Sequence, residues 1–353
     1  MPPGPPTPYL VVDVAVMEAN IDRIARIAGE SGIALRPHVK THKCVEIASR
    51  QVAAGASGIT VATVGEAEVF VDRGFDDVFV AYPVWVDQER AERLRALGEK
   101  ARLAVGVDSA ESARRLGALV PGLEVMVEVD SGQHRSGAAP ARAGDVALVA
   151  ALAGLDVRGV FTFPGHGYDP DGRETAARDE AAALSEAGLS LRAQGIEPRV
   201  LSGGSTPTLE ASLRTGVPTE LRPGVYTLND AQQWELGSAT QDQLAITCRA
   251  TVVSHAGGRL VLDAGAKALG ADRAAYNTGF GRLLDRPAAR IVLLSEHHAV
   301  VEGYADPPPL GAEVRVVPNH VCVAVNLADE LWADHGAGAA LEPWAVAARG
   351  RNW

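Results

Sequence analysis

The residues best able to do chemistry stand where apolar, strand-like runs end. The first such run covers residues 33–39 and leads directly into Lys40. A lysine at the end of a barrel strand points toward the mouth of the barrel, where desolvation lowers its pKa until the neutral amine can form a Schiff base. A lone lysine is more often a surface residue, so the case for Lys40 depends on the segments that accompany it.

Further along the chain, two predicted turns have the composition of a phosphate-binding site. Residues 202–206 read Ser-Gly-Gly-Ser-Thr and precede a helix-like segment at residues 207–213. Backbone N–H groups at a helix start, bare of side chains, can hold a phosphate. Residues 222–226 read Arg-Pro-Gly-Val-Tyr and follow the next strand-like run. Most two-glycine turns are only turns, but barrels commonly bind phosphate after their last two strands, so the pair predicts more than either turn alone.

Two further strand ends carry polar groups. Arg135 offers a planar fork of donors to an anionic oxygen, and a structural ion pair with Asp130 is its alternative. His166 can move a proton near neutral pH, and Tyr168 places a phenol at the same rim. The alternative for His166 is a hydrogen-bonded loop histidine.

A histidine and a cysteine near the C-terminal end form a candidate metal site. Residues i and i+2 of a strand face the same side, so His320 and Cys322 could bind one ion if residues 317–323 are extended. A nitrogen and a thiolate favour zinc, with manganese and magnesium as the alternatives. Two protein ligands leave open positions, as catalytic zinc requires. The ordinary alternative is a core cysteine beside a polar histidine.

Eight strand-like runs must position these groups. They alternate with helix-like segments such as residues 86–98 and 173–194, and this alternation predicts a parallel sheet covered by helices. Eight units over roughly 210 residues match a closed (β/α)8 barrel. An open doubly wound sheet is the alternative, but no glycine-rich dinucleotide turn follows the first strand. The runs cover residues 33–39, 58–63, 77–84, 102–108, 123–130, 157–164, 199–202 and 220–228.

The pattern changes at about residue 242 to short strands without long helices between them. A separate β domain is the simplest interpretation, and we expect residues 9–13, which precede the first barrel unit, to pair with it. The short strands include residues 313–318 and 321–327. We therefore expect a (β/α)8 TIM-type barrel at residues 14–235 and a mainly-β domain formed by residues 1–13 and 236–353.

Composition excludes several classes of function. Lys plus Arg number 33 against 44 Asp plus Glu, and the net charge of −11 disfavours nucleic acid and anionic lipid as partners. Three scattered cysteines, Cys44, Cys248 and Cys322, suit a reducing compartment rather than a disulfide framework. The N-terminal segment lacks the pattern of a secretory signal, and the apolar runs are too short to span a membrane. We expect a cytoplasmic enzyme.

Taken in order, seven motifs resemble those of the D-threonine aldolase and D-serine dehydratase group of fold-type III pyridoxal phosphate enzymes. Members of that group have an alanine-racemase-like barrel followed by a β domain. The resemblance covers nearly the whole chain, and the ordered set is highly specific. The motifs lie at residues 7–9, 36–43, 128–137, 165–168, 203–206, 222–226 and 318–322.

The resemblance implies a role for each candidate residue. Lys40 would hold pyridoxal phosphate covalently and remove the Cα proton of the substrate, with Lys43 as a neighbouring surface lysine. Arg135 would lie near the phenolic oxygen of the cofactor and Arg222 near its pyridine nitrogen. His166 would act as a base in the aldolase alternative, where it takes the proton of the β-hydroxyl, and Tyr168 lies in the same catalytic motif. The remaining cofactor-binding residues would be Gly203, Gly204, Ser205, Gly224, Val225 and Tyr226.

The resemblance also implies a reaction. Aldolase-type members tend to have His-x-Asp as the metal pair, whereas dehydratase-like members have His-x-Cys, as His320 and Cys322 do here. We therefore expect a lyase that converts a D-3-hydroxy amino acid, such as D-serine or D-3-hydroxyaspartate, into an oxo acid and ammonia. Cleavage to glycine and an aldehyde is the alternative, followed by a racemase or a non-catalytic carrier of the cofactor. The expected partner is a small D-amino acid, and the expected assembly is a homodimer.

Overall fold

The computed structural model describes residues 4–353, so the first three residues of the expected segment 1–13 lie outside the described part. The chain divides into two compact units. The barrel unit comprises Ile24–Lys40, Gln51–Gly224 and Arg351–Trp353. The β unit comprises the chain up to Arg23 together with Thr41–Arg50 and Val225–Gly350.

Eight parallel strands form the sheet of the barrel unit. Their order is β2-β9-β8-β7-β6-β5-β4-β3, and a parallel bridge between His38 and Thr60 joins the two ends of that order. All eight predicted strand positions and the TIM-type barrel are therefore confirmed. The strands are β2 (Ala34–Leu35), β3 (Ile59–Val61), β4 (Asp77–Pro83), β5 (Arg102–Val107), β6 (Glu124–Glu128), β7 (Asp156–Phe161), β8 (Val200–Gly203) and β9 (Glu220–Leu221).

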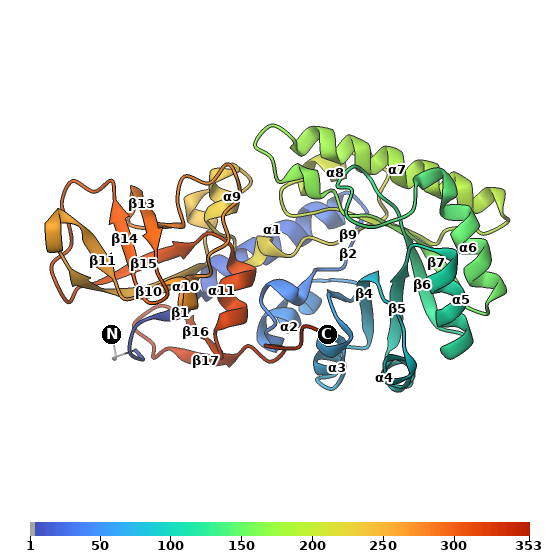
Figure 1. Cartoon of the computed structure of the whole chain (residues 1–353), viewed down its shortest axis with the longest axis horizontal. Helices are drawn as coiled ribbons and strands as arrows, with labels where there is room; N and C mark the ends of the chain where they lie inside the picture. The colour runs from blue at the N-terminus through green and yellow to red at the C-terminus, as the bar shows by residue number, and fades with distance from the viewer. Residues whose placement is uncertain (1–3) are drawn as a thin grey trace. The chain divides into compact units, whose positions relative to one another are not determined.

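Helices connect these strands, and α5 and α6 lie beside β6 and β7 (Figure 1). Thr63, Asp87 and Ser109 cap three of the helices, since each side chain accepts a hydrogen bond from a backbone N–H of the first turn. None of the helices within residues 4–353 is both long and apolar enough to cross a membrane. The helices are α1 (Val14–Glu30), α2 (Val45–Ala53), α3 (Val64–Val71), α4 (Gln88–Gly98), α5 (Ala110–Leu119), α6 (Ala143–Leu152), α7 (Arg173–Ala193) and α8 (Leu209–Thr215), with short 3-10 turns η1 (Val39–Thr41), η2 (Pro140–Arg142) and η3 (Gly165–Gly167).

An apolar cluster packs inside the barrel. Phe79, Ala104, Met126 and Phe161 come from four successive strands and are all buried. The rings of Phe79 and Phe161 meet edge to face with centroids 5.0 Å apart. Full burial of one such side chain contributes roughly 1.5–3 kcal/mol, so this cluster holds the middle strands in register beneath the strand ends.

A charged group also lies inside the barrel. Arg36, whose side chain is 1% exposed, forms ion pairs of 2.6 Å with Asp77 and 2.7 Å with Glu220. These residues belong to three strand regions far apart in the sequence, so the buried guanidinium links the first strand of the barrel to its last. A buried cation of this kind is tolerated only while both carboxylates stay in place.

The β unit is built on a nine-stranded sheet in the order β11-β14-β13-β12-β15-β10-β1-β16-β17, in which β10 also pairs with β11. That pairing closes β10–β15 into an antiparallel barrel. As predicted, β1 joins this sheet, antiparallel to β10 and parallel to β16. The strands are β1 (Tyr9–Asp13), β10 (Ile246–Ser254), β11 (Leu260–Leu262), β12 (Gly281–Leu283), β13 (Arg286–Leu294), β14 (Ala299–Glu302), β15 (Glu313–Pro318), β16 (Glu330–Asp334) and β17 (Glu342–Ala345).

One predicted strand is a helix. Residues 321–327 form α11 (Val321–Leu327), although their three valines favour extended structure. The buried residues Val321, Ala324 and Val325 follow the i, i+3, i+4 spacing of a helix face, so the packing decided against the strand propensity. The other short helices of this unit are α9 (Ala231–Glu235), α10 (Ala266–Leu269), η4 (Val225–Thr227), η5 (Gln241–Gln243) and η6 (Ala256–Gly258).

Candidate active site

Lys40 lies in η1, just beyond the C-terminal end of β2. The backbone just before Lys40 lies beside the segment that leaves β9, because His38 N–H donates to the carbonyl of Pro223 at 3.0 Å. The Lys40 side chain is half-buried, and its Nζ lies 5.9 Å from the ring centroid of Phe163. The amine therefore faces an aromatic ring at the strand ends, as a lysine at a barrel mouth should.

Phe163, which none of the predicted motifs includes as a site residue, lies at the centre of the site in the barrel unit. The guanidinium carbon of Arg135 lies 5.3 Å from its ring centroid, and the ring of Tyr168 lies 6.2 Å away. With Lys40, three predicted residues from different strand ends therefore surround one ring. The available signal was position, since Phe163 follows β7 directly at the end that carries the reactive groups.

Arg135 does not form the ion pair with Asp130 that was its alternative. Asp130 instead accepts hydrogen bonds from the backbone N–H groups of Gly132 and His134, and pairs with the His134 ring at 2.7 Å. Arg135 approaches the buried Glu128 at 3.9 Å while half of its own side chain stays exposed. Burial raises the pKa of Glu128. This arrangement leaves Arg135 only a long contact with a carboxylate, which suits a guanidinium that binds an anionic ligand.

His166 lies in η3 with its two ring nitrogens in different surroundings. Nε2 lies 3.2 Å from Asp179 Oδ2, whereas Nδ1 is buried without a hydrogen-bond partner among residues 4–353. The carboxylate favours a proton on Nε2, so Nδ1 is left as the acceptor. This arrangement leaves Nδ1 as the atom that could accept a proton, and the role of His166 as a base stays a prediction.

In the glycine turn after β8, some of the hydrogen-bond donors expected to bind a phosphate already have partners and one does not. The Gly204 N–H donates to Glu180, and the Ser205 N–H donates to Thr208 Oγ1 at 3.1 Å. Two of the predicted amide donors therefore already have acceptors within the barrel unit. Thr206 Oγ1, in contrast, is buried and has no hydrogen-bond partner in the described structure. An orphaned hydroxyl in this turn fits a bound phosphate oxygen, so the turn as a whole is compatible with the cofactor.

Arg222 is fully packed inside the barrel. It donates to Ser202 Oγ and to the carbonyl of Thr162, and its guanidinium carbon lies 5.3 Å from the ring centroid of Phe161. Burial lowers its pKa, against the attraction of Glu220 and other buried carboxylates. The proposed contact of Arg222 with the pyridine nitrogen stays a prediction.

The other predicted cofactor residues follow Arg222 in the chain. Gly224 ends the long segment of the barrel unit, and Val225 and Tyr226 begin the next segment of the β unit in η4, where both are buried. Their predicted phosphate contacts remain predictions. Lys43, which we expected at the surface, is instead 5% exposed, and its Nζ donates to Asn326 Oδ1 at 2.9 Å. The expectation of a surface lysine was wrong because this ammonium is held inside the β unit.

His320 and Cys322 are neighbours, but not on a strand. His320 precedes α11 and Cys322 lies in its first turn, so a helix start, rather than strand alternation, brings them together. His320 Nδ1 lies 2.6 Å from Asp272 Oδ2. The Cys322 thiol donates a hydrogen bond to Thr41 Oγ1 at 3.4 Å. Since the carboxylate occupies Nδ1, Nε2 is the nitrogen available to a metal.

The charges around His320 favour a cation. Burial lowers its pKa, but Cys322, Asp230 and Asp272 together raise it to about 10. The nearby acidic groups would also favour a metal cation, and the adjacent nitrogen and sulfur donors are of the kinds that zinc prefers. Within the described chain, no group of three or more His, Cys, Asp or Glu side chains is arranged around one point. The metal site of His320 and Cys322 therefore stays a prediction that rests on this pair alone.

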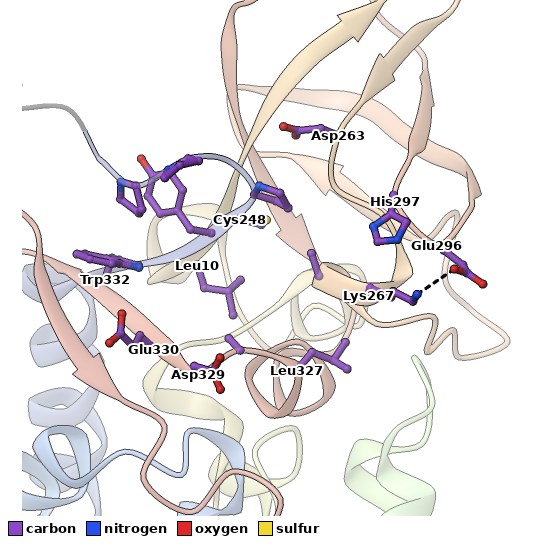
Figure 2. Close-up of a pocket in the computed structure, with 17 residues that line it drawn as sticks. Leu10, Cys248, Asp263, Lys267, Glu296, His297, Leu327, Asp329, Glu330 and Trp332 are labelled. Atoms are coloured by element: carbon purple, nitrogen blue, oxygen red, sulfur yellow. Dashed lines mark ion pairs between the residues drawn. The ribbon is translucent and has the colours of Figure 1, made fainter.

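A separate cavity of about 500 Å³ lies in the β unit, between the start of β1, β16 and the end of α11 (Figure 2). None of the predicted site residues lines it. Its lysine, Lys267, pairs with Glu296 at 3.0 Å, as the dashed line in Figure 2 marks. We assign no chemistry to this cavity, because its lysine is already paired and two of its carboxylates, Asp263 and Asp329, already have partners elsewhere.

Comparisons with known proteins divide the chain in the same order as its sequence pattern. Residues 12–231 match the family model of the alanine racemase N-terminal domain, and residues 245–333 match that of a serine dehydratase domain. The chain is 34% identical to D-threo-3-hydroxyaspartate dehydratase of Delftia sp. (strain HT23), with 90% of each chain covered. It is 35% identical to D-threonine aldolase of Arthrobacter sp., with 99% of this chain and 95% of the relative covered.

The solved structure of the Delftia dehydratase superposes with a TM-score of 0.90 at 31% identity, covering 99% of this chain and 98% of the other. Structures of D-threo-3-hydroxyaspartate dehydratase also include a histidine-to-alanine mutant and a cysteine-to-alanine mutant in the metal-free form. The two substituted positions are two residues apart in that enzyme. The same spacing separates His320 and Cys322.

Proposed function

Because the chain belongs to the family that joins an alanine racemase N-terminal domain to a serine dehydratase domain, we propose that it is a lyase dependent on pyridoxal phosphate and a divalent metal. Its substrates are D-3-hydroxy amino acids. The observation that carries this proposal is the placement of Lys40 and Arg135 around Phe163 at the strand ends of the barrel. An amine and a guanidinium there provide a covalent anchor and an anion contact for the cofactor.

Dehydration, giving an oxo acid and ammonia, is the reaction that we favour. The proposed metal pair is His320 and Cys322, and a relative that has a histidine and a cysteine at this spacing is a dehydratase. Aldol cleavage to glycine and an aldehyde is the second candidate, because the chain is 35% identical to a D-threonine aldolase over nearly its whole length. Sequence identity does not distinguish the two reactions, since this chain is 34% identical to the dehydratase and 35% identical to the aldolase.

The candidate site residues have different roles in the proposed reaction. Lys40 anchors the cofactor and removes the Cα proton of the substrate in the dehydration. In the alternative aldol cleavage, His166 Nδ1 would accept the proton of the β-hydroxyl. Pyridoxal phosphate, when bound, supplies the electron sink for the charge that develops at Cα. His320 Nε2 and Cys322 Sγ would hold the metal, which would act as a Lewis acid on the β-hydroxyl. Asp272 keeps the His320 ring in the orientation that this ligation needs.

Product analysis tests the proposal. The purified protein is supplied with pyridoxal phosphate and zinc, then incubated with D-serine, D-threonine or D-3-hydroxyaspartate, with and without a chelator. Oxo acid and ammonia formed only without the chelator support the dehydratase, and glycine with an aldehyde supports the aldolase. Enantiomer formation that persists with the chelator points to a racemase. No product from any of the three substrates contradicts the proposed lyase.

A further inference from the structure

Glu180 is a buried carboxyl group to which the proposed chemistry assigns no role. It lies in the middle of α7, and its exposure is 0%. The residues buried beside it on the same helix are mostly alanine and leucine, including Ala177, Ala181 and Leu184. A carboxyl group in such surroundings is costly unless hydrogen bonds satisfy it, so its partners indicate what it serves.

The partners of Glu180 belong to the glycine turn after β8. One carboxyl oxygen accepts from the Gly204 N–H, and the other accepts from Ser212 Oγ at 2.5 Å. Gly204 has a φ of +79°, a conformation that side-chain-bearing residues rarely adopt. A Cβ placed on Gly203 would lie 2.2 Å from the Glu180 carboxyl oxygen, so the carboxyl group occupies the space that a side chain at Gly203 would need.

Further hydrogen bonds complete a ring beneath the turn. Ser212 Oγ lies 3.4 Å from Thr208 Oγ1, and Thr208 Oγ1 accepts from Ser205 N–H at 3.1 Å and lies 2.9 Å from Ser205 Oγ. The ring thus runs from Glu180 through Ser212, Thr208 and Ser205 back to the turn. Thr206 lies in the sequence between two members of this ring, Ser205 and Thr208. Its buried hydroxyl has no hydrogen-bond partner in the part of the chain that the structure describes.

We propose that Glu180 is a positioning residue for the phosphate-binding turn, which it holds in the conformation that receives a phosphate monoester. The inference rests on the proposed function, because the phosphate is that of the cofactor. Without the carboxyl group, the Gly204 N–H loses its acceptor and the turn must be ordered when the ligand binds. Preorganisation of this kind strengthens binding by removing that ordering cost.

The surroundings of Glu180 act on its ionisation in both directions. Burial raises the pKa of Glu180, against the opposing effects of Ser212, Gly204 and Arg222. Two of these opposing partners, Ser212 and Gly204, are also the hydrogen-bond donors that join the carboxyl group to the turn.

The test compares pyridoxal phosphate with pyridoxal, which lacks the phosphate. Affinity of the full-length apoprotein for each is measured by absorbance titration in the wild type, Glu180→Ala and Glu180→Gln. We expect Glu180→Ala to weaken pyridoxal phosphate binding by about tenfold and pyridoxal binding by less than about twofold. Glu180→Gln keeps an acceptor for the Gly204 N–H, so its preference for the phosphorylated form should stay within about threefold of the wild type.

Ser190→Ala is the matched control. Ser190 lies on the same helix, and its hydroxyl also makes two hydrogen bonds, accepting from Gly144 N–H at 2.9 Å and donating to the Ala141 carbonyl at 2.8 Å. These bonds join α7 to the region of α6 rather than to the turn. We expect Ser190→Ala to lower the melting temperature by about as much as Glu180→Ala does. Its preference for pyridoxal phosphate over pyridoxal should not change.

The outcomes separate this inference from the proposed function. A wild type that binds neither compound contradicts the function itself. A wild type that prefers pyridoxal phosphate, with an unchanged preference in Glu180→Ala, overturns the role of Glu180, as does an equal loss in Ser190→Ala. If Glu180→Ala yields no folded protein, Ser212→Ala decides, because it removes one of the two carboxyl contacts. A loss of about threefold confined to pyridoxal phosphate supports the proposal, and no selective loss refutes it.

Discussion

Removing Asp272 should weaken metal binding without unfolding the protein. Asp272 Oδ2 lies 2.6 Å from His320 Nδ1, and the two side chains are 51% and 31% exposed. Substituting the carboxylate partner of a metal-bound histidine typically costs 10-fold to 100-fold in metal affinity, because the ring loses both its orientation and part of its basicity. Water screens this half-exposed pair, so we expect the lower end for Asp272→Ala, about tenfold or roughly 1.4 kcal/mol.

The assay is competition between the apoprotein and a chromogenic chelator for zinc. Glu342→Ala is the matched control, because Glu342 Oε2 lies 2.8 Å from His335 Nε2 and those side chains are 57% and 38% exposed. The control pair has the same chemistry and similar exposure, but it does not include either predicted metal ligand. A zinc affinity of Asp272→Ala within about twofold of the wild type, or an equal loss in Glu342→Ala, would refute the assignment of Asp272 as the support of a metal-binding His320.

Three further outcomes concern the barrel unit. Lys40→Ala removes the proposed anchor, so protein soaked in pyridoxal phosphate should lack the visible absorbance of a lysine-bound cofactor, and a spectrum like that of the wild type would assign the cofactor to another lysine. Arg36→Met removes the cation nearest to Asp77 and Glu220 and leaves them longer contacts, of 3.8 and 3.9 Å, with Arg158. It should lower the free energy of unfolding in urea by about 3 kcal/mol, whereas a loss below about 1 kcal/mol contradicts this network. Burial raises the pKa of Glu128 in the folded protein above its unfolded value of about 4.3. The protonated group therefore stabilises the fold fully below about pH 4.3, and this contribution is lost as pH rises through the folded pKa. In Glu128→Gln, the free energy of unfolding in urea should fall less with rising pH than in the wild type, and an unchanged pH dependence would assign that fall to other groups.

The sequence by itself determined the order and type of the barrel elements. Strand and helix periodicities are local properties, so eight strand positions could be predicted from the chain, and all eight are present. Because parallel barrel strands place their C-terminal ends at one mouth, the same pattern also indicated which residues to consider there. Lys40 and Arg135 were found in this way, and the structure places both against Phe163.

Tertiary structure alone decided which partners these groups have. Asp272 reaches His320 across 48 residues of sequence, and Glu180 reaches Gly204 across 24, so no local pattern could have paired them. The same holds for α11, where burial of one helical face outweighed the strand propensity of its valines. Hydrogen bonds and packing between distant segments depend on how the chain closes into its sheets, and that closure sets the surroundings in which each reactive side chain works.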